Sequence, residues 1–482
     1  MVPYVAPPTT RRPGLPSVGA MNSSTSTIRS YDAFAGPGDP GYDEAAISFN
    51  LAAPLRPLGA TTARTVADVQ NAVLAADSAG ARVVPVSTGH STGMLGPVAD
   101  RVHVLRTVLD QPVRVNPDRG IVQIPAGARW DDVVRAAAEH GYAVPHGSSP
   151  TVGAIGYLLG GGMSFYGRKV GVAANSVVSI TLVQADGGIV TVDETNDPDL
   201  FWALRGGGGG FGVVLLVELR MIPMHRVLTG MIAWDATDAA PVARAWATWA
   251  ATAPRAVTTS LRLLNAPDAP ETPEPFRGRQ ILAIDGSIML DDDAPENAGD
   301  IRRALAEPLS SLVTPLVDTW HVGPVTDAVR THADPEEPIP YTSDAFALAG
   351  IDDDTIDRWY AAAGPGSGSG LIAAELRQLG GAFAETPPGA GAFSGIDAEL
   401  LAFNVGLAVS LEGTAQARLD LLRIRATLRP YTTNRTAPTF VEEPSTPRRT
   451  FADDVEARVD EIRKRVDPDG LFALDVRRSS GM

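Results

Sequence analysis

Residues 150–162 read PTVGAIGYLLGGG, and they lie within a longer glycine-rich stretch, 146–171. Two similar stretches occur in the same half of the chain: RVVPVSTGHSTGMLG at 82–96 and RGGGGGFG at 205–212. Small residues leave backbone N–H groups accessible, and successive N–H groups form concave binding sites for phosphate oxygens. Together the three stretches favour a large, phosphate-bearing ligand held mostly by backbone groups. No G-K-[ST] follows any of them, which excludes a P-loop.

The second stretch contains GHSTG, residues 89–93, which matches the G-x-S-x-G pattern of serine hydrolases. In those enzymes a helix begins directly after the nucleophilic serine, which would be Ser91 here. Gly93, Gly96 and Pro97 make a helix at that position unfavourable. A hydrolase that uses Ser91 therefore remains only a remote alternative.

The third stretch contains G-x-G-x-x-G at Gly207, Gly209 and Gly212. A nicotinamide-binding fingerprint follows a strand and opens a helix. Here the order is reversed, because a helical pattern precedes the glycines and the strand-like VVLLVELR follows them. Six glycines in eight residues cost conformational entropy, which favours a close approach of the backbone to a ligand.

The composition is that of a globular protein of 482 residues, with 44% hydrophobic and 20% charged residues. A net charge of −16 disfavours nucleic acid and anionic membranes as partners. The absence of cysteine excludes disulfides and cysteine-ligated zinc, and we expect no metal site. The N-terminus lacks an apolar signal region, so residues 1–30 are predicted to be a disordered leader on a cytoplasmic protein without a membrane span.

Helix and strand patterns alternate up to about Pro223. Residues 65–80 and 130–141 have the apolar periodicity and end signals of helices, with a strand predicted at 81–87. After Pro223, apolar runs alternate with helical stretches, which indicates an antiparallel sheet covered by helices. The sequence therefore predicts an α+β fold.

Several motifs, taken in order, resemble one family. They are the GH of 89–90, PTVGAIGYLLGGG, DPDLFWALRGGGGGFGVV at 197–214 and a late R-x-DPDGLF ending at 472. This ordered set is similar to the FAD-linked oxidases related to berberine bridge enzyme and hydroxynicotine oxidase, which have the vanillyl-alcohol-oxidase type of flavin fold. The resemblance implies a two-part FAD-binding domain, 31–222 plus 437–482, and an inserted substrate-binding domain, 223–436.

The resemblance also implies how FAD is held. In the family, the histidine at the position of His90 carries the flavin through its 8α carbon. A neutral imidazole nitrogen is a nucleophile, and unperturbed histidine is mostly neutral near pH 7. The other positions that the family's pattern places around FAD are Ser87, Thr88, Gly89, Ser91, Ser149, Pro150, Thr151, Val152, Gly153, Gly156, Gly160, Gly161, Gly162, Gly212 and Val213.

The chain departs from the family at three places. Many relatives attach FAD a second time through a cysteine at the position of Ser149, so a single covalent link is expected here. Ser87 and Thr88 replace the usual glycines before the histidine. The family's late Tyr-x-Asn resembles Phe440-Val441-Glu442 in this chain, so a role of that tyrosine as base is either vacant or has moved to another residue.

By resemblance, the function is that of an oxidase that takes a hydride from a C–H bond of a small organic substrate and passes it to flavin N5. Valine at position 152 resembles the residue that lets oxygen reach the flavin, so O₂ is the expected oxidant and hydrogen peroxide the product. A dehydrogenase or an oxygenase on the same fold, and a non-catalytic flavin-binding protein, remain alternatives. The chain is expected to be a monomer or a homodimer.

Three residues are candidates for catalysis. Glu375, in the strand-like IAAELRQLGG, and Glu442 are each a candidate base. Arg377 either binds a substrate oxyanion or pairs with a carboxylate. Few aromatic residues occur in 223–436, which favours a moderately apolar secondary metabolite over a sugar as substrate.

Overall fold

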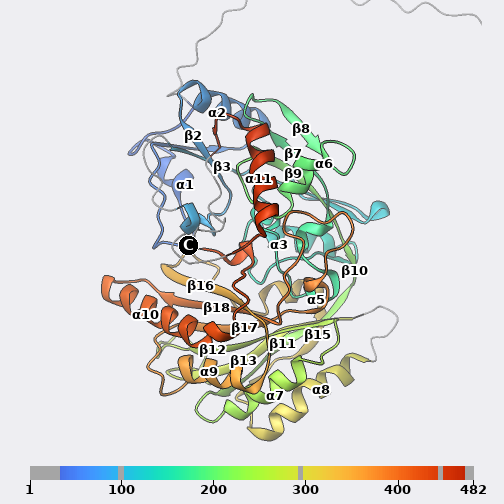
Figure 1. The fold of residues 1–482 in the computed structure, drawn as a ribbon, viewed down its shortest axis with the longest axis vertical. Helices are drawn as coiled ribbons and strands as arrows, with labels where there is room; N and C mark the ends of the chain where they lie inside the picture. Colours follow the sequence, from blue (N-terminus) through green and yellow to red (C-terminus); the bar gives the residue numbers. More distant parts are fainter. Residues whose placement is uncertain (1–32, 96–101, 291–296, 443–448, 473–482) are drawn as a thin grey trace, which may run out of the picture.

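The computed structural model describes residues 33–95, 102–290, 297–442 and 449–472 (Figure 1). The expected leader, residues 1–30, lies outside these ranges. Figure 1 shows an upper part, formed by the N-terminal half of the chain and helix α11 (Asp453–Val466), stacked on a lower part formed by the middle of the chain. Strands and helices occur in both parts, which confirms the predicted α+β fold.

The first sheet of the upper part is parallel and has the strand order β1-β3-β2. Helix α2 connects β1 to β2, and it begins at Thr65, whose side chain forms the predicted capping box with Asp68. The elements are α1 (Tyr42–Ala46), β1 (Gly59–Ala63), α2 (Val66–Ser78), β2 (Arg82–Val86) and β3 (Val102–Thr107).

The second sheet of the upper part is antiparallel, in the order β4-β5-β9-β7-β8, and β6 pairs separately with β10. Its helices pack apolar residues such as Trp130 and Phe201 into one core with the strands. The strands are β4 (Arg114–Asn116), β5 (Ile121–Pro125), β6 (Tyr142–Ala143), β7 (Val177–Val183), β8 (Ile189–Val192), β9 (Val213–Arg220) and β10 (Ile222–Pro223). The helices are α3 (Trp130–Ala138), α4 (Ala154–Leu159), α5 (Gly167–Val170) and α6 (Pro198–Leu204).

The lower part contains one eight-stranded sheet in which every described pairing is antiparallel, as the sequence predicted. Its order is β14-β11-β13-β12-β17-β18-β16, and β15 also pairs with β11. The strands are β11 (Arg226–Asp235), β12 (Val257–Asn265), β13 (Gln280–Met289), β14 (Val317–Asp318), β15 (His321–Pro324), β16 (Tyr341–Leu348), β17 (Ala373–Gln378) and β18 (Leu400–Leu407).

Four helices cover the face of this sheet that points away from the upper part (Figure 1). They are α7 (Ala240–Ala250), α8 (Asn297–Leu312), α9 (Asp353–Ala363) and α10 (Leu411–Leu428). Side chains alternate between the two faces of a strand. On β12, Leu261 and Leu263 therefore pack against the helices, while Arg262 and Leu264 face the upper part and line a cavity.

Within the ranges that the structure describes, no helix has both the length and the apolar composition needed to cross a bilayer.

Candidate active site

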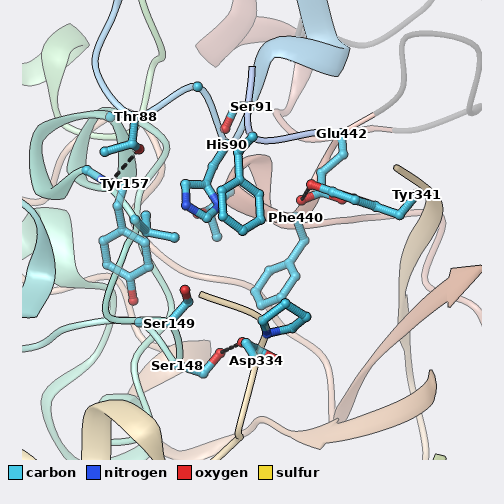
Figure 2. A pocket seen from close by; sticks show the side chains of 18 of the residues that line it. Thr88, His90, Ser91, Ser148, Ser149, Tyr157, Asp334, Tyr341, Phe440 and Glu442 are labelled. Carbon is cyan, nitrogen blue, oxygen red and sulfur yellow. Dashed lines mark hydrogen bonds between the residues drawn. The ribbon is translucent and has the colours of Figure 1, made fainter. Parts of the chain in front are cut away.

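A cavity of about 1130 Å³ lies where the two parts meet (Figure 2). The upper part contributes loops from all three glycine-rich stretches of the sequence. The lower part contributes the open face of the large sheet, including residues of β12, β17 and β18. The glycine-rich loops on one side of the cavity and the sheet on the other thus come from different segments of the chain.

His90 lies on the wall of this cavity, in the loop that follows β2. Its ring stacks on Phe49, with 3.7 Å between ring centroids and 18° between ring planes. Its Nε2 is 3.1 Å from the Thr151 hydroxyl. Burial lowers the pKa of His90 to about 4, so the imidazole is neutral near pH 7. Thr151 therefore contacts a neutral imidazole through the Nε2 side of its ring.

The chain after Ser91 forms a single 3₁₀ turn, Thr92–Leu95, and not the α-helix that a nucleophile elbow requires. Ser91 lines the cavity, and no histidine hydrogen bond reaches it among the contacts of the described residues. The structure therefore gives no support to the hydrolase alternative.

Two glycines allow the loops of the upper part to approach each other closely. A Cβ at Gly153 would lie 2.8 Å from the Ser87 hydroxyl oxygen, and the Gly153 N–H donates to the Thr88 hydroxyl at 3.0 Å. Gly89 has φ of +82°, a conformation that side chains disfavour. These contacts hold the loop of His90 against the loop that begins α4, so both line one surface.

The RGGGGGFG loop is held from outside by the C-terminal helix α11. The Arg463 guanidinium donates to the carbonyls of Gly207 and Gly209, and it lies 4.7 Å from the Phe211 ring centre. A Cβ at Gly210 would come within 2.7 Å of Arg463 Nε. The glycines therefore serve a close approach of two distant segments, and Gly212 at the end of this loop lines the cavity.

Glu442 lies on the cavity wall beside the edge strand β16 (Figure 2). The Tyr341 hydroxyl donates to its Oε1 at 3.2 Å, and the Ser343 hydroxyl donates to its Oε2 at 2.6 Å. Tyr341 also lines the cavity. A tyrosine hydroxyl and a carboxylate are thus paired in the cavity, although the tyrosine lies on β16 and not at position 440, where the family pattern has it.

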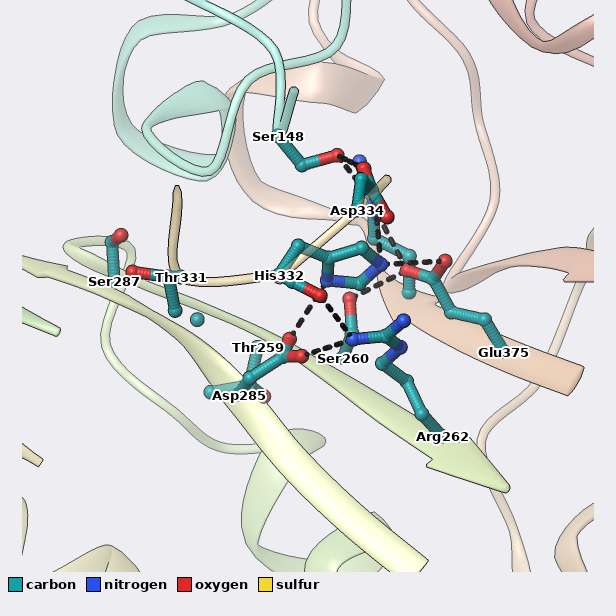
Figure 3. Close-up of polar contacts among 12 residues, drawn as sticks. Ser148, Thr259, Ser260, Arg262, Asp285, Ser287, Thr331, His332, Asp334 and Glu375 are labelled. Atoms are coloured by element: carbon teal, nitrogen blue, oxygen red, sulfur yellow. Dashed lines mark hydrogen bonds and ion pairs between the residues drawn. The ribbon is translucent and has the colours of Figure 1, made fainter. Parts of the chain in front are cut away.

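A second group of charged side chains, the buried charge cluster, lies on the cavity-facing side of the large sheet (Figure 3). His332 Nδ1 lies 3.1 Å from Asp285 and its Nε2 lies 3.3 Å from Glu375. Glu375 also accepts from Arg377 Nε at 2.7 Å. Asp285 accepts from Arg262 Nη1 at 2.9 Å. Each of these five side chains is at least nine-tenths buried.

The charges in this cluster fix one another's protonation. Burial and Arg262 disfavour a charged His332, but the carboxylates of Asp285 and Glu375 outweigh them and raise its pKa to about 9. Burial alone would raise the pKa of Glu375, but Arg377 and His332 hold it well below its usual range. At neutral pH the histidine is therefore a cation and Glu375 an anion.

This arrangement predicts that the protein loses stability as the pH rises from about 6.5 to above 9. The folded-state pKa of His332, about 9, exceeds its ordinary value of 6.5. The resulting stabilisation is complete below pH 6.5 and is lost as the pH passes 9, and it amounts to roughly 3 kcal/mol of unfolding free energy. Urea unfolding at closely spaced pH values measures this loss. The His332→Gln variant should be less stable than the unaltered protein at pH 6.5, and its free energy of unfolding should change little between pH 6.5 and 9.5. A variant that loses as much stability over this pH range as the unaltered protein would contradict the assigned charge.

A segment of the upper part matches a known family. Residues 57–193 match the family described as FAD binding domain. The chain carries an FAD-binding domain. This FAD-binding domain includes the loops of His90 and Gly153, and therefore much of the cavity wall described above.

Curated relatives are similar over part of this chain. Carbohydrate oxidase from Microdochium nivale is 34% identical over 197 residues, which are 40% of this chain and 40% of that protein. Glucooligosaccharide oxidase from Sarocladium strictum is 35% identical over 191 residues, 39% of this chain and 38% of that protein. The matched segments thus span about two fifths of the length of these relatives.

Solved structures are similar over nearly the whole fold. BBE-like 1 from Physcomitrella patens has a TM-score of 0.75 at 21% identity and covers 92% of this chain and 96% of its own. 6-Hydroxy-D-nicotine oxidase from Arthrobacter nicotinovorans has a TM-score of 0.75 at 20% identity and covers 91% of this chain and 96% of its own. Glucooligosaccharide oxidase from Acremonium strictum has a TM-score of 0.70 at 21% identity and covers 92% of this chain and 96% of its own. The FAD of that protein is described as 6-S-cysteinyl and 8α-N1-histidyl. These likenesses confirm the fold that the sequence motifs implied.

The cavity fits FAD in its size and in its donors. Its volume exceeds the roughly 300–1,000 Å³ of pockets for drug-sized ligands. The lining residues from 84–95, 147–159 and 209–214 include no lysine or arginine, so the diphosphate would be held by backbone N–H groups and hydroxyls. The Tyr157 hydroxyl is buried on this wall with no hydrogen-bond partner in the described chain, and a bound ligand would supply one.

The structure brings most of the predicted FAD positions together. Those that line the cavity are Ser87, Thr88, Gly89, His90, Ser91, Ser149, Val152, Gly153, Gly156, Gly212 and Val213. Five others lie behind this surface: Pro150, Thr151, Gly160, Gly161 and Gly162.

The residues behind the surface have packing or orienting roles. Thr151 holds the His90 ring. A Cβ at Gly161 would lie 2.6 Å from the Phe393 ring, and one at Gly162 would lie 2.3 Å from the Tyr157 ring. The glycine run that ends PTVGAIGYLLGGG therefore makes room for two aromatic rings.

Sequence reasoning missed several residues of the cavity. They include Phe49, Arg262, His332, Tyr341 and Phe403. The alternation of side chains along a strand shows that Arg262 and Phe403 each lie on one of the two faces of their strands. It does not show that this face is the one that lines the cavity. His332 belongs to a loop, where no periodic signal exists.

Proposed function

We propose that this protein is an FAD-dependent oxidase of small organic substrates, with residues 31–222 plus 437–482 as the FAD-binding domain and 223–436 as the substrate-binding domain. The observation that supports it best is the placement of a neutral His90 on the wall of a cavity that fits FAD. Its similarity, over part of the chain, to proteins named as oxidases and as an FAD-linked oxidoreductase also supports the proposal.

His90 would hold the cofactor through Nδ1. The Thr151 hydroxyl engages Nε2, and the ring stacked on Phe49 cannot turn freely. Ser149 lines the cavity where a second attachment would require a cysteine, so His90 would form the single covalent link. Bound FAD would supply the hydride acceptor.

Tyr341 and Glu442 would remove the proton that the substrate must lose. When a hydroxyl or amine is oxidised, its O–H or N–H proton leaves as the C–H hydrogen leaves with two electrons. The Tyr341 oxygen would accept that proton while the Tyr341 hydroxyl proton passes to Glu442. Together with Tyr341, Glu442 would thus serve as the base in place of the family's late tyrosine.

Glu375 is less suited to proton removal. Its two carboxylate oxygens already accept hydrogen bonds from Ser260, His332 and Arg377. Its pKa is held low, which makes it a weak base. We assign Glu375 to the positioning of Arg377.

The proposal is tested by the reoxidation of the reduced protein. Photoreduced, anaerobic protein is mixed with oxygenated buffer in a stopped-flow instrument, and peroxide is measured by a coupled peroxidase assay. An oxidase reoxidises within seconds and releases one peroxide per flavin. Reoxidation over many minutes would instead indicate a dehydrogenase. Protein that contains no flavin after expression with added riboflavin would overturn the proposal.

A further inference from the structure

Two guanidinium groups lie next to each other on the cavity-facing side of the large sheet. In the pairing of β12 with β17, Arg262 lies opposite Glu375 and Ser260 lies opposite Arg377. Arg262 and Arg377 are therefore diagonal neighbours on the same face of the sheet. Both line the cavity, and both are more than nine-tenths buried.

The carboxylates near these arginines are already occupied. Glu375 accepts from Ser260 at 2.6 Å, from Arg377 at 2.7 Å and from His332 at 3.3 Å. Asp285 uses one oxygen for His332 and the other for Arg262. The buried acceptors of this cluster are thus satisfied by the groups around them.

The donors are not all satisfied. A guanidinium has five N–H groups. Arg262 makes its hydrogen bonds to the described chain through Nη1 alone, and its buried Nε has no acceptor there. Arg377 donates from Nε to Glu375 and from Nη2 to the Ser148 hydroxyl, and its Nη1 makes no hydrogen bond to the described residues. A buried N–H without an acceptor is costly, as at Arg262 Nε. An acceptor that enters the cavity would offer a partner to the unused N–H groups of both arginines, since both side chains line it.

The arginines are fixed in position. Arg377 lies between two aromatic rings, 4.9 Å from the Phe165 centre and 5.1 Å from the Phe440 centre. Arg262 is held by Asp285 and by the His332 carbonyl. A rigid pair of planar donors matches the two oxygens of a carboxylate.

The neighbouring residues determine what the carboxylate is attached to. Leu264 on β12, Ile281 on β13, and Ala373 and Val405 on β17 and β18 line the same cavity. They lie on the same face of the sheet as the two arginines, farther along the strands. This surface is apolar, and it would contact the body of a ligand whose acidic group reaches the arginines.

We propose that the substrate of this enzyme is a carboxylic acid with an apolar body, and that Arg262 and Arg377 form its carboxylate subsite. This inference rests on the proposed oxidase function, since the same cavity would hold FAD. Asp334 lies at the edge of the subsite, where its Oδ2 accepts from Ser148 at 3.0 Å (Figure 3). Asp334 is half-buried and lines the cavity, and its carboxylate acts electrostatically on Arg262, Arg377 and His332. The buried part of the cluster contains these three cations against Asp285 and Glu375.

The test compares matched acids and amides as ligands of the purified holoprotein. The probes are benzoate against benzamide and 4-phenylbutyrate against 4-phenylbutyramide. Binding is measured by calorimetry and by the perturbation of the flavin absorbance. Each acid should bind on the order of 10- to 100-fold more tightly than its amide, because charge-assisted hydrogen bonds replace neutral ones. Equal affinities of acid and amide would overturn the subsite.

Variants locate the preference. Arg377→Gln and Arg262→Gln should each remove most of the preference for the acid while changing amide affinity little. Arg425→Gln is the matched control: Arg425 also pairs with a carboxylate, Asp344, and lies 4.7 Å from an aromatic ring centre, but it is remote from the cavity lining. It should keep the acid preference. A preference retained in both cavity variants would assign these arginines to folding alone and would overturn the proposal.

Two further comparisons keep the test decisive. If a glutamine variant fails to fold, Arg377→Lys retains the charge but loses the planar fork, and it should reduce the acid preference by roughly tenfold. Calorimetry needs no turnover, so the subsite can fail while peroxide formation stands. Conversely, a protein that prefers acids but releases no peroxide would retain the subsite and lose the oxidase function.

Discussion

Replacing Glu442 by glutamine should lower kcat by about 10²- to 10⁴-fold, the range typical for loss of a positioned base. The expected cause is specific. Glutamine can still accept a hydrogen bond from the Tyr341 hydroxyl, but it cannot take up its proton. Steady-state oxygen consumption with the best available substrate measures kcat. The flavin absorbance and the KM should change little, because Glu442 faces Tyr341 and Ser343.

Tyr341→Phe provides the second half of this test. If the proton passes through Tyr341 to Glu442, the two single variants and the double variant should lose similar amounts of activity, because the residues act as a unit. Glu271 lines the same cavity but is exposed, so Glu271→Gln should stay within about twofold of the unaltered protein. Activity of Glu442→Gln within a few-fold of normal would remove Glu442 from the mechanism.

Replacing His90 by alanine should abolish covalent retention of the flavin. The alanine variant can still bind FAD through the backbone of the glycine-rich loops, so it should be purified yellow, or become yellow when FAD is added. After acid precipitation the pellet should be colourless, whereas that of the unaltered protein should be yellow. Activity should fall as well, because the covalent bond is expected to raise the flavin potential.

His146 offers a matched control for this variant. It is a buried histidine of the same half of the chain, and burial also lowers its pKa to about 4. Its Nδ1 lies 2.6 Å from the Gly147 carbonyl, and it is absent from the cavity lining. His146→Gln should leave a yellow pellet. A yellow pellet from His90→Ala would mean that another residue carries the flavin.

Much of the fold could be predicted because its signals are local. The capping box at Thr65 and Asp68 marks the start of α2, and the pattern of 130–141 marks α3. The order of helix, glycine loop and strand around 197–220 separates this chain from a nicotinamide-binding fold, and the structure has α6 and β9 in that order. Each of these features depends on residues close together in the sequence.

The cavity wall of the FAD-binding domain was predictable for a related reason. Its residues lie in short runs of small residues, and the ordered motifs identify the runs. The substrate side was not predictable in the same way. The buried charge cluster joins β12, β13, β17 and the loop of His332, so its residues are far apart in the sequence. Without the sheet order, Asp285 reads as an ordinary charged residue, and Glu375 is a candidate base whose partners Ser260 and His332 cannot be recognised.

The chemical class of the substrate could not be predicted from the composition of the substrate-binding segment. Low aromatic content in 223–436 favoured an apolar metabolite over a sugar. The cavity nevertheless collects Phe276, Tyr341 and Phe403 from that segment, as well as both arginines. Average composition does not reveal this concentration of aromatic and cationic side chains at one place.

We propose above that one imidazole, that of His90, carries the flavin of this protein. The most direct measurement is to unfold the purified protein in acid, digest it with a protease and identify every flavin-containing peptide by mass spectrometry. We expect one such peptide, with the added mass located on His90 and none on any other residue. Flavin released free into the acid supernatant, with an unmodified peptide containing position 90, would contradict it.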